Sequence, residues 1–159
     1  MIQTLDLESL HSREAQSIER EVGQQAMTRS ETNSEQITGG IRVSVRARYS
    51  AEHSDPIHNQ WFFLYTIQIS NESEQSCQLI SRHWIIRDAT GRTEEVRGPG
   101  VVGEQPQLNP GESFEYTSGC PLPTPYGSME GIYEMQGPDG GAFDARIARF
   151  ELREASAIH

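Results

Sequence analysis

Lysine is absent from the sequence, so all 13 basic residues are arginine. A phosphate-binding Walker loop needs a lysine beside its last glycine, and this class of nucleotide site is therefore excluded. The formal net charge of −10 also disfavours non-specific binding to nucleic acid or to an anionic membrane. Arginine binds carboxylates and phosphates through a planar fork of donors. A local basic pocket built from arginines stays compatible with this composition.

Cysteine is also scarce, since the chain contains only Cys77 and Cys120. Their separation matches no zinc-ligand spacing. Residues 1–10 carry Asp6 and Glu8 and do not resemble a secretory signal, and no run approaches the ~20 apolar residues of a membrane span. We therefore expect free thiols in a soluble protein of a reducing, cytoplasmic compartment, with no cofactor and no membrane contact.

Aromatic residues are missing from residues 1–40, and all of them lie between Tyr49 and Phe150. The hydrophobic core must therefore come from roughly the last 120 residues, a length that suits one domain.

The first 40 residues are predicted to be an extension of that domain. Residues 1–27 have weak helical character, in which part of one face is shared by Leu7, Leu10, Ile18 and Val22. Residues 28–40 are polar and end in two glycines, which is typical of a flexible linker. We divide the chain into a disordered or helical extension (1–38, with the linker at 28–40), a domain (39–153) and a tail (154–159).

From Ile41 onward, apolar and polar residues alternate with the period of a half-buried strand. Strand-like segments recur without any intervening helical pattern, at 41–49, 61–69, 77–88, 93–96, 114–118, 129–136 and 143–152. We expect a β-bulge near Ser81-Arg82, where the alternation breaks. We expect a loop over Cys120–Gly127, because prolines do not fit a central strand. The sequence thus contains about seven or eight strands. They predict an all-β protein that folds as an antiparallel sandwich of immunoglobulin or fibronectin-III type.

Four longer runs in this region are distinctive: SRHWIIRD at 81–88, GPGVVGEQP at 98–106, LNPGESFEYTSG at 108–119 and GSMEGIY at 127–133. With the strands at 41–49 and 59–71, they resemble the ApaG family over residues 38–153. The resemblance implies the same immunoglobulin- or fibronectin-III-like sandwich. It also implies an association with cobalt tolerance and magnesium efflux, and kinship with interaction modules of eukaryotic F-box proteins and of a polymerase-interacting protein. It assigns no catalytic residue.

The first candidate site contains G-x-G-x-x-G, formed by Gly98, Gly100 and Gly103. A dinucleotide site needs a helix that begins at the last glycine, because the helix N-terminus binds the pyrophosphate. Glu104-Gln105-Pro106 follows instead, so the motif does not predict a Rossmann site.

Two interpretations of this glycine segment stay open. Its glycines permit positive φ and close backbone approach, as a purely structural loop requires. Alternatively, the segment binds a small anion or a protein, with Arg82 and Arg97 supplying charge and Trp84 or Tyr126 acting as aromatic anchors.

A second candidate is the polar loop that carries His53, Asp55 and His58. Imidazole and carboxylate groups bind Co²⁺ or Zn²⁺, but a tight site needs three or more converging ligands. A solvated polar loop is the alternative interpretation, and the sequence assigns no metal site.

No nucleophile motif is recognisable, so we do not expect an enzyme. The sequence favours a non-enzymatic ApaG-type binding module that recognises a protein partner or a small anionic ligand. One alternative is a Co²⁺/Mg²⁺ homeostasis factor that acts indirectly or by weak metal binding. Another is a protein that binds or hydrolyses nucleotides or pyrophosphate.

Overall fold

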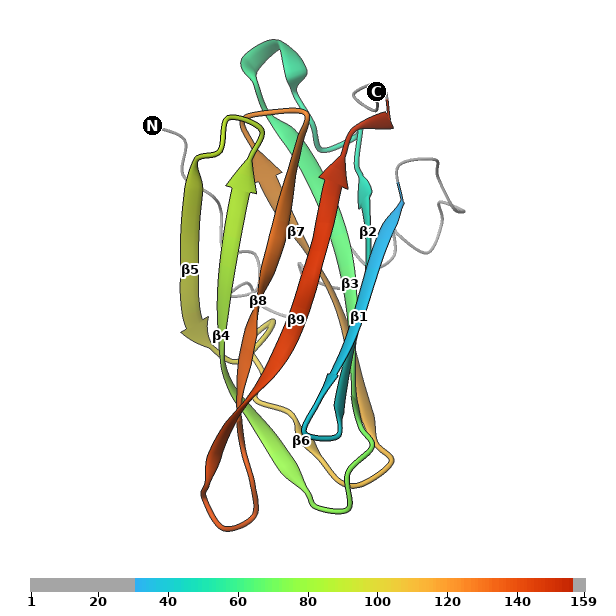
Figure 1. Cartoon of the computed structure of the whole chain (residues 1–159). Helices are drawn as coiled ribbons and strands as arrows, with labels where there is room; N and C mark the ends of the chain where they lie inside the picture. The colour runs from blue at the N-terminus through green and yellow to red at the C-terminus, as the bar shows by residue number, and fades with distance from the viewer. Residues whose placement is uncertain (1–30, 156–159) are drawn as a thin grey trace.

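Alternating apolar residues build the two β-sheets of this computed structural model, which describes residues 31–155 (Figure 1). The first, here called the β3 sheet, has the order β1 (Thr32–Thr38), β2 (Ile41–Tyr49), β3 (Trp61–Asn71), β7 (Ser113–Leu122). The second, the β8 sheet, has the order β5 (Thr93–Pro99), β4 (Cys77–Asp88), β8 (Tyr126–Gln136), β9 (Ala142–Arg153), and β6 (Gln107–Leu108) pairs with β4. A short 3₁₀ helix, η2 (Pro56–His58), lies in the loop between β2 and β3.

All strand pairs are antiparallel, and the two sheets face each other as the layers of a sandwich (Figure 1). The predicted all-β sandwich of the immunoglobulin- or fibronectin-III-like class is confirmed. The expected bulge in β4 is also present, since the register with β8 shifts between Leu79 and Ser81.

Strand β1 corrects the linker that we expected over residues 28–40. Thr32–Thr38 pairs with β2 along its whole length. Its inward side chains are polar: Ser34 donates a 2.8 Å hydrogen bond to the carbonyl of Ala148 in β9, and Thr32 also donates to a β9 carbonyl. Because these bonds replace apolar burial, β1 lacks the apolar alternation that marks the other strands. Residues 1–30 and 156–159, which hold most of the predicted extension and tail, lie outside the described residues.

Strand β7 corrects the proline-rich loop that we expected over Cys120–Gly127. The strand continues through Cys120 and Pro121 to Leu122, and β8 already begins at Tyr126. Among the described strands β7 pairs only with β3, and an edge strand accepts a proline because its outer N–H groups need no partner.

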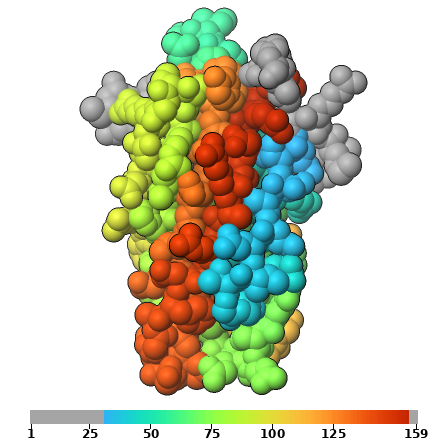
Figure 2. Space-filling view, in the orientation of Figure 1, coloured from blue at the N-terminus to red at the C-terminus, as the bar shows by residue number. Residues whose placement is uncertain are grey.

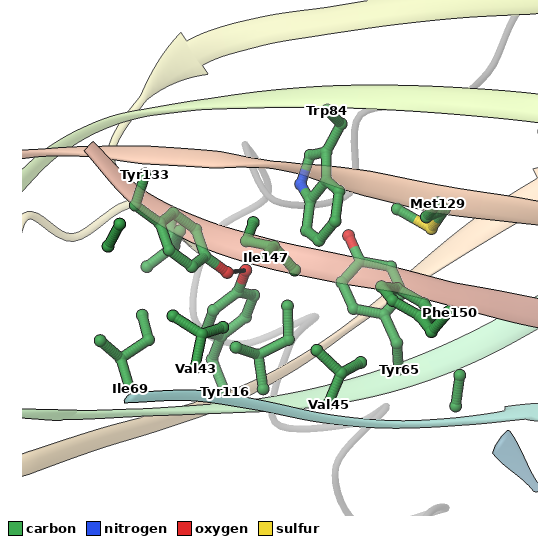
Figure 3. Close-up of a cluster of buried hydrophobic side chains, with 14 of the residues drawn as sticks. Val43, Val45, Tyr65, Ile69, Trp84, Tyr116, Met129, Tyr133, Ile147 and Phe150 are labelled. Carbon is green, nitrogen blue, oxygen red and sulfur yellow. Dashed lines mark hydrogen bonds between the residues drawn. The ribbon is translucent and has the colours of Figure 1, made fainter. Parts of the chain in front are cut away.

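The core lies between the sheets, and Trp84 is among its largest buried side chains (Figure 3). The indole makes edge-type contacts with Tyr65, Tyr133 and Phe150, at ring-centroid distances of 5.5, 6.4 and 6.0 Å. The hydroxyl groups of Tyr116 and Tyr133 lie 2.5 Å apart and join the two sheets by a buried hydrogen bond. Such aromatic pairs add stabilisation beyond the area that they bury. Trp84 and Ile86 of β4 thus belong to the core.

Both cysteines are free thiols and buried. Burial raises the pKa of the Cys77 thiol above its usual value, which disfavours the reactive thiolate. The described residues contain no helix that is long and apolar enough to span a membrane.

Candidate functional site

The glycine segment Gly98–Pro106 leaves β5 and reverses direction in a tight turn. Val101 and Glu104 exchange both of their backbone hydrogen bonds, of 2.8 and 2.9 Å. Between them, Val102 and Gly103 have φ angles of 44° and 81°, as in a type I′ turn. A β-branched residue seldom adopts positive φ. The Val102 side chain is buried in the core, and this burial offsets the backbone strain.

Arg82 lies beneath this segment and is only 1% exposed. Its Nη1 donates 2.8 Å hydrogen bonds to the carbonyl oxygens of Pro99 and Gly100. A Cβ on Gly98 would stand 2.9 Å from Nη2 of Arg82. The absence of a side chain at Gly98 therefore makes room for a buried guanidinium.

Gly100 is required for a different reason. Its φ is +61°, and a Cβ would stand 2.3 Å from the carbonyl oxygen of Glu104. Its N–H donates to the carbonyl of Ile80 at the β4 bulge, and the Gln105 amide donates to the same oxygen, both at 2.9 Å. The glycine segment is thus fastened to β4 as a structural cap.

The direction of the backbone groups in this loop corrects the anion-loop interpretation for Arg82. An anion-binding loop directs backbone N–H groups at its ligand. Here the loop directs carbonyl groups at a buried arginine, which leaves Arg82 no access to a ligand from solvent. The glycines Gly98 and Gly100 have a structural explanation, and ligand binding by the exposed Gly103 stays a prediction.

The two predicted aromatic anchors lie in different environments. Trp84 is 2% exposed and belongs to the core, so its prediction as an interface anchor is wrong. Tyr126 is 46% exposed and begins β8, opposite Arg153 of β9. The sequence-predicted residues Arg82, Trp84, Arg97 and Tyr126 therefore do not form one site.

Arg97 lies on the outer face of the β8 sheet, where it starts a row of four cross-strand neighbours. The row runs from Arg97 through His83 and Ile132 to Arg146, one residue from each of β5, β4, β8 and β9. Figure 2 shows this side of the molecule, with β1 beside β9. The row places three potentially cationic side chains around one isoleucine.

An open groove of about 250 Å³ lies on the same face. Its lining includes the half-buried Ile85 and Ile132, and its charged members are His83, Glu130, Arg146 and Arg149. Gln36 of β1 also lines it, so the groove reaches the corner where β1 meets β9. The groove thus combines apolar side chains with charged ones, and protein interfaces combine an apolar centre with a polar rim.

Most charges on this face are paired. The Nε2 of His83 lies 2.8 Å from Oε1 of Glu95, and this hydrogen bond lowers the pKa of Glu95 below its usual value. Arg97 is 3.7 Å from the same oxygen, and its side chain is 72% exposed. Arg149 pairs with Glu151 at 3.3 Å. Arg146 makes no ion pair with any of residues 31–155.

The histidine loop does not bring its three candidates together. His58 Nδ1 lies 2.6 Å from Asp55 Oδ2, whereas His53 Nδ1 contacts the hydroxyl of Ser50 at 2.8 Å. Within the described part of the chain, no group of three or more His, Cys, Asp or Glu residues is placed to hold a metal ion. The cation hypothesis therefore gains no site from this loop.

Sequence reasoning missed Ile85, Ile132, Arg146 and Arg149. One signal was present: in β4 the core residues Trp84 and Ile86 share one parity, which places His83 and Ile85 on the outer face. The register between β4, β8 and β9 is what adds Ile132 and Arg146, and a single strand pattern contains no such information.

Residues 51–137 match the family model described as the ApaG domain, more than half of the chain. The chain belongs to the ApaG family. Its relatives include Protein ApaG of Bordetella pertussis, which is 53% identical over 119 residues that cover 75% of this chain and 91% of the relative. Protein ApaG of Methylobacterium sp. (strain 4-46) is 55% identical over 115 residues, 72% and 88% of the two chains.

A crystal structure described as an ApaA protein from Bordetella pertussis has the same fold. It superposes with a TM-score of 0.69 at 55% identity, and the match covers 71% of this chain and 92% of that one. The ApaG match at 51–137 includes the glycine segment, its partner Arg82 and the groove residues of β4 and β8. Neither printed name states an activity, so function has to be argued from the surface.

Proposed function

We propose that this ApaG domain is a non-enzymatic binding module that recognises a protein partner through the outer face of the β8 sheet. The supporting observation is the groove in which Ile85 and Ile132 lie between charged side chains. A partner that covers these half-buried isoleucines removes more of their surface from water, and the surrounding polar groups form a rim.

Arg146 indicates the chemistry of the partner. Unlike Arg149 and Arg97, it makes no ion pair within residues 31–155, and Glu130, which lines the same groove, is paired with Arg87. Arginine and carboxylate form strong, geometrically specific pairs. We therefore propose that the partner presents an acidic side chain to Arg146 and an apolar one to Ile132.

The size of the groove favours a protein over a small ligand. Its volume of about 250 Å³ lies below the ~300–1,000 Å³ typical of small-molecule sites, whereas a protein partner also contacts the sheet around it. A small anion at Arg146 is the alternative. The two free thiols support placing this interaction in a reducing, cytoplasmic compartment.

Partner capture with surface variants tests this proposal. The full-length chain, Ile132→Glu and Arg146→Glu are used as baits in lysate of the source cells, with quantitative mass spectrometry of what each retains. Arg92→Glu is the matched charge control, because Arg92 is exposed in the turn between β4 and β5. Thermal melts establish that each bait is folded.

We expect the wild type and Arg92→Glu to retain the same protein, and the two groove variants to lose it. Equal recovery by folded groove variants would overturn the proposal. Titration with phosphate and pyrophosphate, followed by NMR, covers the small-anion alternative: saturable shifts confined to the groove residues would replace the protein partner by an anionic ligand.

A further inference from the structure

Strand β5 is the outermost strand of the β8 sheet, and within residues 31–155 no strand pairs with its outer edge (Figure 1). The other edge strand of this sheet, β9, lies beside β1. Side chains of β1 occupy that edge: Thr38 Oγ1 accepts a 3.2 Å hydrogen bond from the N–H of Arg146, and Ser34 donates to a β9 carbonyl. The edge of β5 is therefore the open edge of the β8 sheet.

The hydrogen-bond ladder between β4 and β5 shows which backbone groups this open edge offers. At the two ends of the ladder, the carbonyl of Arg92 accepts a hydrogen bond from β4 and the N–H of Gly100 donates one to β4. In an antiparallel ladder the hydrogen-bonded residues alternate. The residues between these ends that direct N–H and C=O groups away from β4 are therefore Thr93, Glu95 and Arg97. Such a row of backbone groups is a template for pairing with another strand.

The side chains along this edge determine which strand fits it. Charged residues on an edge strand ordinarily discourage pairing with another chain. Here Glu95 and Arg97 have opposite charges and are both exposed on the outer face, and Val96 between them packs against the core. In an antiparallel pair of two β5 strands with the two-fold axis at Val96, each Glu95 faces Arg97 of the other copy. Opposite charges at directly facing positions stabilise a pair of strands.

We propose that β5 is a dimerisation edge, on which two copies of this chain pair their β5 strands antiparallel about Val96. In this register Glu95 and Arg97 of the second copy exchange both of their backbone hydrogen bonds through the groups that point outward. Moving the two-fold axis by one residue, to Glu95 or to Arg97, places like charges opposite each other, which is destabilising. The charge pattern thus selects one register over its two neighbours.

The contacts that these two side chains make within one copy leave both able to reach a second one. Glu95 uses the same oxygen, Oε1, for His83 at 2.8 Å and for Arg97 at 3.7 Å. The other carboxylate oxygen, Oε2, makes no hydrogen bond or ion pair with residues 31–155. The Arg97 side chain is 72% exposed. An ion pair between copies therefore does not require the bond between Glu95 and His83 to break.

This dimer joins the outer faces of two β8 sheets into one surface. Within one copy Glu95 is the cross-strand neighbour of Ile85, which lines the groove. The row that starts at Arg97 therefore continues through Glu95 of the second copy to Ile85 of the second copy, and both grooves lie on one continuous sheet. Because the pairing uses β5 alone, it forms whether or not the groove binds a protein partner.

Sedimentation equilibrium of the full-length chain tests the proposal. One pair of strands buries less surface than a standard interface, so we expect a weak, reversible dimer between about 10 µM and 1 mM protein. Arg97→Glu places like charges opposite each other, and we expect the Kd to rise about tenfold or more. Glu95→Arg combined with Arg97→Glu restores opposite charges, and the Kd should return to within about threefold of the wild-type value.

Arg46→Glu is the matched control, because it makes the same charge change at an exposed side chain of the β3 sheet. We expect it to dimerise like the wild type. Thermal melts establish that each variant is folded. A monomer over the whole concentration range would overturn the proposal, and so would a folded Arg97→Glu variant that dimerises as tightly as the wild type.

Cysteine crosslinking tests the register. Val96 faces Val96 of the second copy in a non-hydrogen-bonded pair, where the Cα atoms are about 4.5 Å apart and close enough for a disulfide. We expect Val96→Cys to form a disulfide-linked dimer under mild oxidation. Thr93→Cys faces Pro99 of the second copy and should form none. Both native thiols are buried, which limits their oxidation. Dimers that are linked equally well at position 93, or that position 96 does not link, would contradict this pairing.

Discussion

The guanidinium of Arg82 occupies the space that a side chain at Gly98 would need. A Cβ there would lie 2.9 Å from Nη2. Arg82 cannot withdraw easily, because it is 1% exposed and Nη1 is bonded to two carbonyl groups of the glycine segment. The glycine motif and the buried arginine are therefore one structural unit.

Gly98→Ala is expected to destabilise the fold by about 1–3 kcal/mol, because overpacking forces the guanidinium from its hydrogen bonds. Urea unfolding measures the change. The matched control is Gly137→Ala, where the nearest atom to the new Cβ is 3.5 Å away and the expected change is within about 0.5 kcal/mol. Equal stability of the two variants would show that Arg82 adjusts freely.

The alternation of apolar residues predicted most of the strands, because each of those strands buries one face. Strand β1 could not be found this way, since Thr32 and Ser34 are held by hydrogen bonds to β9. A polar strand of this kind has the composition of a linker. Only its hydrogen bonds to the carbonyl groups of β9 distinguish the strand from a linker.

The candidate site was harder to predict than the fold. Arg82 shares the parity of Trp84 and Ile86, and the strand pairs without a break from Ser81 onward, so simple alternation from Trp84 would have predicted Arg82 to face inward. The groove around Ile132 depends on which strands are neighbours, and that register arises from long-range pairing. Residue type alone made Arg97 a candidate charged group. It could not show that Arg97 and Arg146 belong to the same row of cross-strand neighbours.

At Val102 we expect replacement by glycine to cost less stability than replacement by alanine, the reverse of the usual order. Replacing a residue by glycine is ordinarily worse than replacing it by alanine, by about 0.5–1 kcal/mol. At φ 44° the order should reverse, because alanine retains the left-handed strain of about 1–2 kcal/mol and glycine does not. Both variants lose the buried valine side chain, so both are less stable than wild type.

We therefore expect Val102→Gly to be more stable than Val102→Ala by about 1 kcal/mol in urea unfolding. Val101 serves as the control, since it is also buried but has no positive φ, and there alanine should be the better replacement. The same order at both positions would mean that the backbone at Val102 is not strained.

Tyr116 and Tyr133 form a pair that a double-mutant cycle can separate. Either single change to phenylalanine leaves one buried hydroxyl without its partner, which costs about 1–3 kcal/mol. The double variant removes both hydroxyls, so we expect it to be little worse than one single variant. Urea unfolding of the four proteins gives the coupling energy, expected at about 1–2 kcal/mol. Additive losses would show that each hydroxyl is satisfied elsewhere.

The pair formed by Glu95 and His83 makes stability depend on pH at the edge of the groove. The hydrogen bond from His83 is the largest cause of the lowered pKa of Glu95, and the charge of Arg97 contributes less. A carboxyl whose pKa is lower in the folded chain stabilises the fold above its unfolded pKa of about 4.3, and this stabilisation is lost as pH falls through the folded pKa.

His83→Leu should therefore raise the pKa of Glu95 toward its usual value and flatten the acid limb of the stability curve. Arg97→Gln should do the same to a smaller extent, because its guanidinium is 3.7 Å away and largely exposed. Carbon-13 NMR of the Glu95 carboxyl follows the pKa directly, and urea unfolding between about pH 3 and pH 5 follows the stability. A larger rise in Arg97→Gln than in His83→Leu would contradict the assignment of the hydrogen bond as the main cause.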